Sequence, residues 1–150
     1  MTVDVVTETV IDRPVEAVSS YALDPSNAPH WYANIEAVAW KTSPPATVGT
    51  KVAFVARFLG RRLEYTYELC DVVPGERLVM RTAEGPFPME TTYTWAPVGF
   101  GSTRMTLRNR GEPAGFSKLI APLIAPAMRR ANRKDLAQLK EILEHEGSGS

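Results

Sequence analysis

The spacing of hydrophobic positions changes along the chain, and each spacing predicts a different element. From residue 62 to 73, apolar side chains such as Tyr65 and Tyr67 alternate with charged or hydroxyl side chains. This alternation is typical of a strand with one buried and one solvated face. From residue 116 to 143, apolar residues instead recur every three to four positions. That spacing predicts an amphipathic helix of roughly 28 residues.

Before the alternating region, the pattern predicts a strand and two short helices. β-branched residues dominate residues 3–11, as is typical of a strand. Short helices are expected at residues 15–24 and 26–32, separated by Pro25, because the residue before a proline avoids the helical region. Further strands, with turn residues between them, are expected at residues 35–41, 51–59, 62–73, 77–83, 89–95 and 103–110.

Two prolines fall inside the predicted C-terminal helix. Pro122 and Pro126 each remove a backbone donor and crowd the preceding turn, so we expect a bend or break within residues 119–128. A basic run at residues 129–134 is followed by Asp135 and several glutamates. This charge pattern indicates the polar face of an amphipathic helix rather than an arm that binds nucleic acid.

One arrangement buries all of these apolar faces. The antiparallel strands form a curved sheet, and the long helix lies across its concave side. The predicted fold class is therefore α+β, with six to seven antiparallel strands wrapped around a long C-terminal helix and two short helices after the first strand. The 150 residues fit one domain, which we place at residues 1–146. We expect Gly-Ser-Gly-Ser at residues 147–150 to be a flexible tail of artificial origin.

Charge and composition narrow the functional classes. Lys and Arg number 17, as do Asp and Glu, whereas a dedicated nucleic-acid binder needs a basic excess. No apolar run approaches the ~20 residues of a membrane span, and residues 1–11 lack the pattern of a secretion signal. With one cysteine, Cys70, and two histidines, the sequence offers no intramolecular disulfide and no zinc site. We therefore expect a cytoplasmic monomer or homodimer without metal or cofactor, with at most transient membrane contact.

Several short motifs are similar to those of one known superfamily. They are the segment at residues 24–32, Val-Gly-Thr at 48–50, Pro-Gly-Glu-Arg-Leu at 74–78 and Gly-Ser-Thr-Arg-Met-Thr at 101–106. Together with the order of elements, they resemble the helix-grip fold of the START-like (SRPBCC) superfamily, in its polyketide cyclase/dehydratase-like branch, over residues 3–144. The resemblance implies a deep apolar cavity between sheet and helix. Members bind lipids, sterols or polyketides there, and some catalyse cyclisation or dehydration.

Aromatic and amide side chains on the predicted concave face are candidate ligand contacts. Tyr65, Tyr67 and Tyr93 either are core aromatics or place hydroxyls inside an apolar pocket, as small-molecule sites do. Asn109 needs a partner or a wet cavity, because an unpaired buried amide costs about 1–3 kcal/mol. The predicted ligand contacts are Trp31, Tyr32, Phe54, Tyr65, Tyr67, Met80, Met89, Tyr93, Leu107, Asn109, Phe116 and Ile120.

These patterns assign no catalytic residue. Glu64 and Glu68 fall on the solvated face, where cross-strand pairing with arginine is the ordinary role of a carboxylate. His30 is by default an exposed loop residue, and Cys70 lacks a second cysteine or a basic pattern that would activate it. The sequence contains no nucleophile elbow and no phosphate-binding glycine loop.

Two functions stay open, with a third as a contrast. The first is binding of an apolar small molecule of lipid, polyketide or aromatic type in the cavity between sheet and helix. The alternative is a cofactor-independent cyclase or dehydratase acting on a polyketide-like or aromatic substrate, with a tyrosine hydroxyl stabilising an enolate and Asn109 orienting it. Binding ranks first because no residue is a convincing strong base. A partner-binding protein would instead show a filled core and an exposed apolar patch.

Overall fold

The computed structural model describes residues 2–85, 88–112 and 121–148, and its main feature is a seven-stranded antiparallel sheet. The strand order is β1-β7-β6-β5-β4-β3-β2, so β2 to β7 follow one another as a meander and β1 pairs with β7. The strands are β1 (Val3–Ile11), β2 (Ile35–Trp40), β3 (Lys51–Phe58), β4 (Arg61–Val73), β5 (Arg77–Glu84), β6 (Met89–Val98) and β7 (Ser102–Gly111).

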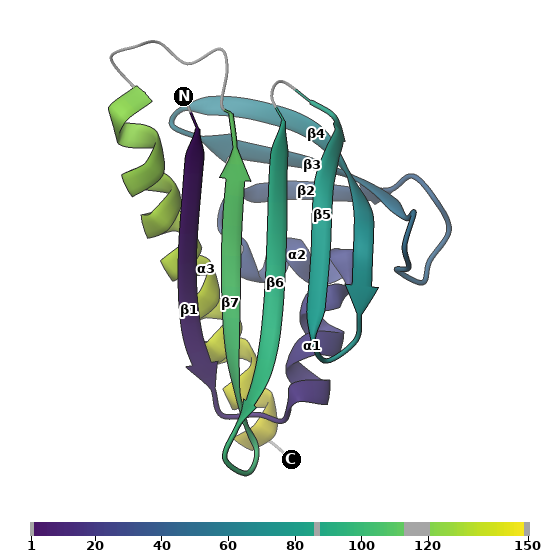
Figure 1. Cartoon of the computed structure of the whole chain (residues 1–150), viewed down its shortest axis with the longest axis vertical. Helices are drawn as coiled ribbons and strands as arrows, with labels where there is room; N and C mark the ends of the chain where they lie inside the picture. The colour runs from purple at the N-terminus through teal and green to yellow at the C-terminus, as the bar shows by residue number, and fades with distance from the viewer. Residues whose placement is uncertain (1, 86–87, 113–120, 149–150) are drawn as a thin grey trace.

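The helices cover the concave side of this sheet (Figure 1). Between β1 and β2 lie α1 (Val15–Leu23), the 3₁₀ turn η1 (Pro25–Asn27) and α2 (Ala28–Trp31). The long helix α3 (Ala121–Ser148) runs beside β1. This arrangement confirms the predicted α+β helix-grip architecture, with two short helices after the first strand.

Local chemistry accounts for the sharp turns that shape the sheet. Between β3 and β4, Leu59 and Gly60 both have positive φ angles, 50° and 78°. Two such residues form the tight turn whose twist matches paired antiparallel strands. Between α1 and η1, Asp24 accepts the backbone N–H of Ser26 at 3.0 Å, and Pro25 starts the next turn. The two short helices are therefore separated at the point that the sequence predicts.

The long helix differs from its prediction in two respects. It is continuous from Ala121 through Pro126, so an interruption is wrong for residues 121–128, whereas a bend there stays a prediction. The exposed Pro126 removes a single helical hydrogen bond, which a continuous helix tolerates. At its C-terminal end α3 reaches Ser148, so two residues expected in a flexible tail are helical.

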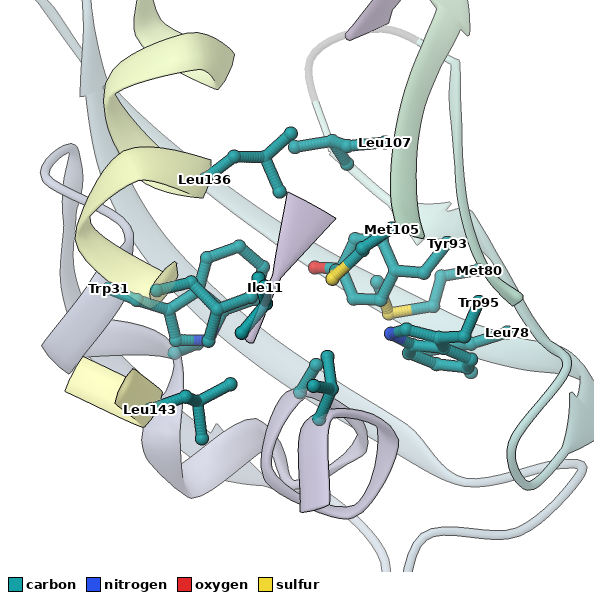
Figure 2. Packing of buried hydrophobic residues seen from close by; sticks show 14 of the residues in the cluster. Ile11, Trp31, Leu78, Met80, Tyr93, Trp95, Met105, Leu107, Leu136 and Leu143 are labelled. Carbon is teal, nitrogen blue, oxygen red and sulfur yellow. The ribbon is translucent and has the colours of Figure 1, made fainter. Parts of the chain in front are cut away.

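The predicted alternation holds for the aromatic positions and for Glu64, but Thr66, expected on the solvated face of β4, is buried. Phe54, Tyr67 and Tyr93 are buried on the concave face, whereas Glu64 on the opposite face of β4 is exposed. Figure 2 shows Leu136 and Leu143 of α3 within the cluster formed with these concave residues. This cluster lies between the sheet and the C-terminal half of α3, and a second one packs Ile124 and Met128 of α3 against Val3 and Val5 of β1.

Polar contacts also attach this half of α3 to the end of β1. The guanidinium of Arg13 donates to the carbonyl of Leu143 at 2.7 Å, and the ammonium of Lys140 donates to the carbonyl of Val10 at 2.7 Å. Two side chains thus hydrogen-bond one carbonyl of α3 and one carbonyl of β1, and so join the two elements. Within the described residues, no helix is long and apolar enough to cross a membrane.

Two substitutions on α3 test which face of the helix carries the fold. Leu139 is fully buried in the core, whereas Leu123 is 57% exposed. Leu139→Ala should lower the free energy of unfolding by about 2–5 kcal/mol, because it removes buried methyl groups and leaves a cavity. Leu123→Ala should change it by less than about 0.5 kcal/mol. Urea unfolding measures both, and equal losses would contradict the placement of α3.

Candidate functional site

A cavity of about 150 Å³ lies between the sheet and α3. Every described helix and strand except β1 contributes a lining residue. An apolar cavity of roughly this volume holds one benzene molecule, while pockets for drug-sized ligands span about 300–1,000 Å³. In this conformation the space therefore fits a body the size of a single ring.

Most of the predicted ligand contacts surround this cavity. Lining residues from the prediction are Trp31, Tyr32, Phe54, Tyr65, Tyr67, Met80, Met89, Tyr93 and Asn109. Leu107 does not line it: it is fully buried two residues before Asn109, in the part of the core that contains Leu136 (Figure 2). Phe116 and Ile120 fall outside the described residues. Contact of these residues with a ligand stays a prediction.

Two groups of aromatic rings form the cavity walls. In the first, the ring of Trp31 lies 4.1 Å from that of Tyr32 and 5.7 Å from that of Tyr93, measured between centroids. The hydroxyls of Tyr32 and Tyr93 are hydrogen-bonded, which ties the end of α2 to β6. In the second group, Tyr65 and Tyr67 of β4 pack edge to face at 5.1 Å, beside Phe54 of β3. Such tilted and edge-on pairs are the favoured aromatic geometry.

The amide of Asn109 is paired inside the protein. The hydroxyl of Thr91 donates to its carbonyl oxygen at 2.7 Å, and the hydroxyls of Thr91 and Tyr67 lie 3.0 Å apart. Because Thr91 has one hydroxyl hydrogen, which Asn109 receives, Tyr67 donates to Thr91. Of the two alternatives open for Asn109, the structure therefore shows the internal partner. This chain links β4, β6 and β7 across one wall of the cavity.

Asp135 of α3 brings a buried carboxyl group to the cavity. Its side chain is 2% exposed and accepts the backbone N–H of Ala33 at 3.0 Å. Burial raises the pKa of Asp135 to about 6, against smaller opposite effects of the Ala33 hydrogen bond and the charge of Lys134. A carboxyl group with this pKa exchanges its proton close to neutral pH.

The charge of Asp135 reaches both aromatic groups. Burial raises the pKa of the Tyr32 and Tyr65 hydroxyls well above the usual range, and the negative charge of Asp135 adds to both shifts. Tyr93 follows the same pattern, with its pKa raised by burial first and by Asp135 last. Burial also raises the pKa of Tyr67 to about 12. The tyrosines therefore stay protonated and able to donate at any physiological pH.

Sequence reasoning missed Asp135 and its neighbour Asn132. Both lie at positions that belong to the apolar stripe of α3, between Met128 and Leu139, and both are buried. Their spacing could have revealed them, because both fall at positions where the helical repeat expects an apolar residue. The charge pattern instead assigned them to the solvated face of the helix. The amide nitrogen of Asn132 and the indole nitrogen of Trp31 are buried donors for which the described residues supply no acceptor.

The described residues contain no group of three or more His, Cys, Asp or Glu side chains placed to hold a metal ion. The cavity presents an apolar space, several hydroxyl groups, the amides of Asn34, Asn109 and Asn132, and the carboxyl group of Asp135. These groups can bind one small molecule and hydrogen-bond its polar end. They can also give or take a proton at Asp135.

Comparisons with known proteins agree with this architecture. A family model described as polyketide cyclase / dehydrase and lipid transport matches residues 2–144. No curated protein matches the sequence. The structure resembles the protein TTHA0849 from Thermus thermophilus, at 22% identity and a TM-score of 0.81, over 95% of this chain and 98% of that one.

Two further solved structures are similar at lower identity. One is the Zhui aromatase/cyclase from Streptomyces sp. R1128, at 13% identity and a TM-score of 0.81, covering 96% of this chain and 94% of the other. The second is a START superfamily protein from Mycobacterium smegmatis, at 13% identity and a TM-score of 0.80, covering 95% and 97%. At such identities the likeness shows the shared fold.

The raised pKa of Asp135 makes a prediction about stability and pH. From the ordinary 3.8 up to about 6, the folded protein holds a proton that the unfolded chain has lost. The free energy of unfolding therefore falls as pH rises through this window, by about 3 kcal/mol for a shift of this size. Asp135→Asn keeps an oxygen for Ala33 and cannot titrate. Its stability relative to the native protein should therefore rise by about 2 kcal/mol between pH 4 and pH 7.5.

Urea unfolding of both proteins at the two pH values measures this difference. The carboxylates of Asp4, Glu90 and Glu144, whose pKa values are lowered by basic partners, titrate equally in both and cancel in the comparison. A stability difference that does not change with pH would show that Asp135 titrates normally.

Proposed function

The chain belongs to the polyketide cyclase / dehydrase and lipid transport family, and on that premise we propose that it binds one small, largely apolar molecule between the sheet and α3. The observation that carries the proposal is the cavity itself. It is walled by two aromatic groups and lined by residues from nearly every element. A protein that needed only a stable fold gains nothing from such a hollow, because unfilled space in a core lowers stability.

The size of the cavity favours one of the three ligand types that the sequence leaves open. A volume of about 150 Å³ suits a single aromatic ring or a body of similar size. A long lipid or an extended polyketide would require the walls to move apart. The polar groups of α3, Asn132 and Asp135, make an amphipathic ligand with one polar end the best match.

A residue that fills the cavity should abolish binding. Ala131 of α3 lines the cavity, whereas Ala137 on the same helix is exposed. Ala131→Phe should weaken binding of benzyl alcohol by about tenfold or more, because the new ring occupies the space of the ligand. Ala137→Phe should leave the affinity unchanged. Both are measured by titration with NMR detection, after urea unfolding has shown that both variants fold.

Equal affinities in the two variants would place the bound molecule somewhere other than this cavity. Absence of saturable binding by the native protein to benzyl alcohol, toluene and phenol alike would contradict the proposed function. Native mass spectrometry of freshly purified protein adds a direct view of any molecule that co-purifies.

One observation favours catalysis as the second candidate function. Asp135 is buried at the cavity with a pKa of about 6, which suits a group that must both take and give a proton near neutral pH. Tyr32, Tyr65 and Tyr93 are protonated hydroxyl donors that can stabilise an enolate oxygen. Together these groups support a cofactor-independent cyclase or dehydratase acting on an aromatic or polyketide-like ketone.

Proton exchange separates an enzyme from a carrier. If the protein is such an enzyme, it should exchange the α-protons of phenylacetone for deuterium in D₂O faster than buffer alone does. NMR follows this exchange. Asp135→Asn should slow the enzymatic rate constant by about 10²–10⁴-fold while the KM changes little. Asp71→Asn alters an exposed carboxylate paired with Arg77 and should have no effect. Saturable binding of phenylacetone without exchange would exclude enolisation of that ketone.

A further inference from the structure

Asp135 is a buried carboxylate for which the described residues supply no counterion. The ion pairs within residues 2–85, 88–112 and 121–148 join partly exposed side chains, and none includes Asp135. Among the described residues, its hydrogen-bond partner is the backbone N–H of Ala33. A buried charge without a partner costs several kcal/mol, so its presence in a cavity needs a compensating group.

The basic groups near the cavity do not fill this role. Arg57 is among the lining residues, but its guanidinium is paired with Glu36 on β2. Lys134 precedes Asp135 on α3 and lies on the exposed side of the helix, as does His30 on α2. Without one of these groups as a partner, the carboxylate is neutralised either by a proton or by a bound cation.

The carboxyl group of Asp135 lines the same cavity as both aromatic groups. The negative charge of Asp135 acts on the hydroxyls of Tyr32 and Tyr93 in the first aromatic group and of Tyr65 in the second. Asp135 thus lies within electrostatic range of both walls. A carboxylate next to several aromatic rings is the environment that attracts an organic cation, because the ring faces are negative and an ammonium also pairs with the carboxylate.

We infer that the ligand of this cavity is an aromatic or similarly apolar amine, bound as its ammonium ion with the charged nitrogen against the Asp135 carboxylate and the apolar body between the two aromatic groups. This inference rests on the proposed function and adds the charge of the ligand to it. The competing class is a neutral alcohol or ketone, which would use the unpaired amide nitrogen of Asn132, one helical turn from Asp135.

The pH range in which the charge acts follows from the groups that face Asp135. They are the hydroxyls of Tyr32, Tyr65 and Tyr93, whose raised pKa values keep them neutral between pH 5 and 8. Asp135 itself, with a pKa of about 6, loses its proton within this range. Binding of an ammonium ion should therefore strengthen from pH 5 to pH 8, while binding of a neutral molecule should not.

Two probes of nearly equal size and shape decide between the classes. Benzylamine, which is an ammonium ion at these pH values, and benzyl alcohol are each titrated into the full chain at pH 5 and pH 8 with NMR detection. At pH 8 we expect benzylammonium to bind about tenfold more tightly than benzyl alcohol, and this preference to shrink severalfold at pH 5. Equal or tighter binding of the alcohol at pH 8 overturns the inference and leaves the proposed function standing.

Two matched variants locate the charge that the cation recognises. Asp135→Asn should remove the preference for benzylammonium and leave the affinity for benzyl alcohol within about twofold. Asp71→Asn removes a surface carboxylate and should preserve the preference. An unchanged preference in Asp135→Asn overturns the inference, because the cation would then bind elsewhere. If Asp135→Asn does not fold, the pH series on the native protein decides alone, and binding of neither probe contradicts the proposed function itself.

Discussion

The structure depends on the burial of the concave face of the sheet under α3. The two halves of the helix meet this requirement differently. Its C-terminal half places Leu136, Leu139 and Leu143 against the sheet, and these fully buried side chains fill the space. Its N-terminal half packs Ile124 and Met128 against Val3 and Val5 of β1, and the cavity is bordered there by these two side chains together with Ala131 and Asn132. One helix therefore supplies both buried core contacts and part of the cavity lining.

Asp135 lies at the boundary between the filled and the hollow part. It is followed at once by Leu136 and accepts the N–H of Ala33, which lies 102 residues earlier in the sequence. The carboxyl group thus fixes the segment after α2 against α3 and at the same time borders the cavity. Because Trp31 and Tyr32 directly precede Ala33, the position of the first aromatic group depends on the same carboxyl group that determines the charge of the site.

The sequence predicts the aromatic walls of the cavity better than it predicts the buried carboxyl group of Asp135. A period of two assigns side chains such as Tyr65 and Tyr67 to one face, and a slip of one residue would expose them all, so the assignment is robust. The same alternation places Leu107 on the concave face, which is correct, although Leu107 does not line the cavity. How far the cavity extends along β7 depends on the side chains of α3 that face the sheet, and the alternation does not predict this. Asp135 was missed because a charged residue in a helix is usually solvated, and the residues that enclose it come from distant strands.

The two uses considered for Asp135 exclude one another within a single complex. A bound ammonium ion stabilises the carboxylate and lowers its pKa, which removes its ability to give or take a proton near neutral pH. A bound ketone carries no charge and keeps water away from Asp135, so the pKa of this carboxyl group stays near or above 6. Asp135 can then still exchange a proton with the ketone. On either proposal, the charge of the ligand would therefore decide whether Asp135 only binds it or also transfers a proton. The two proposals need no difference in the walls of the cavity, because they differ in the state of one carboxyl group.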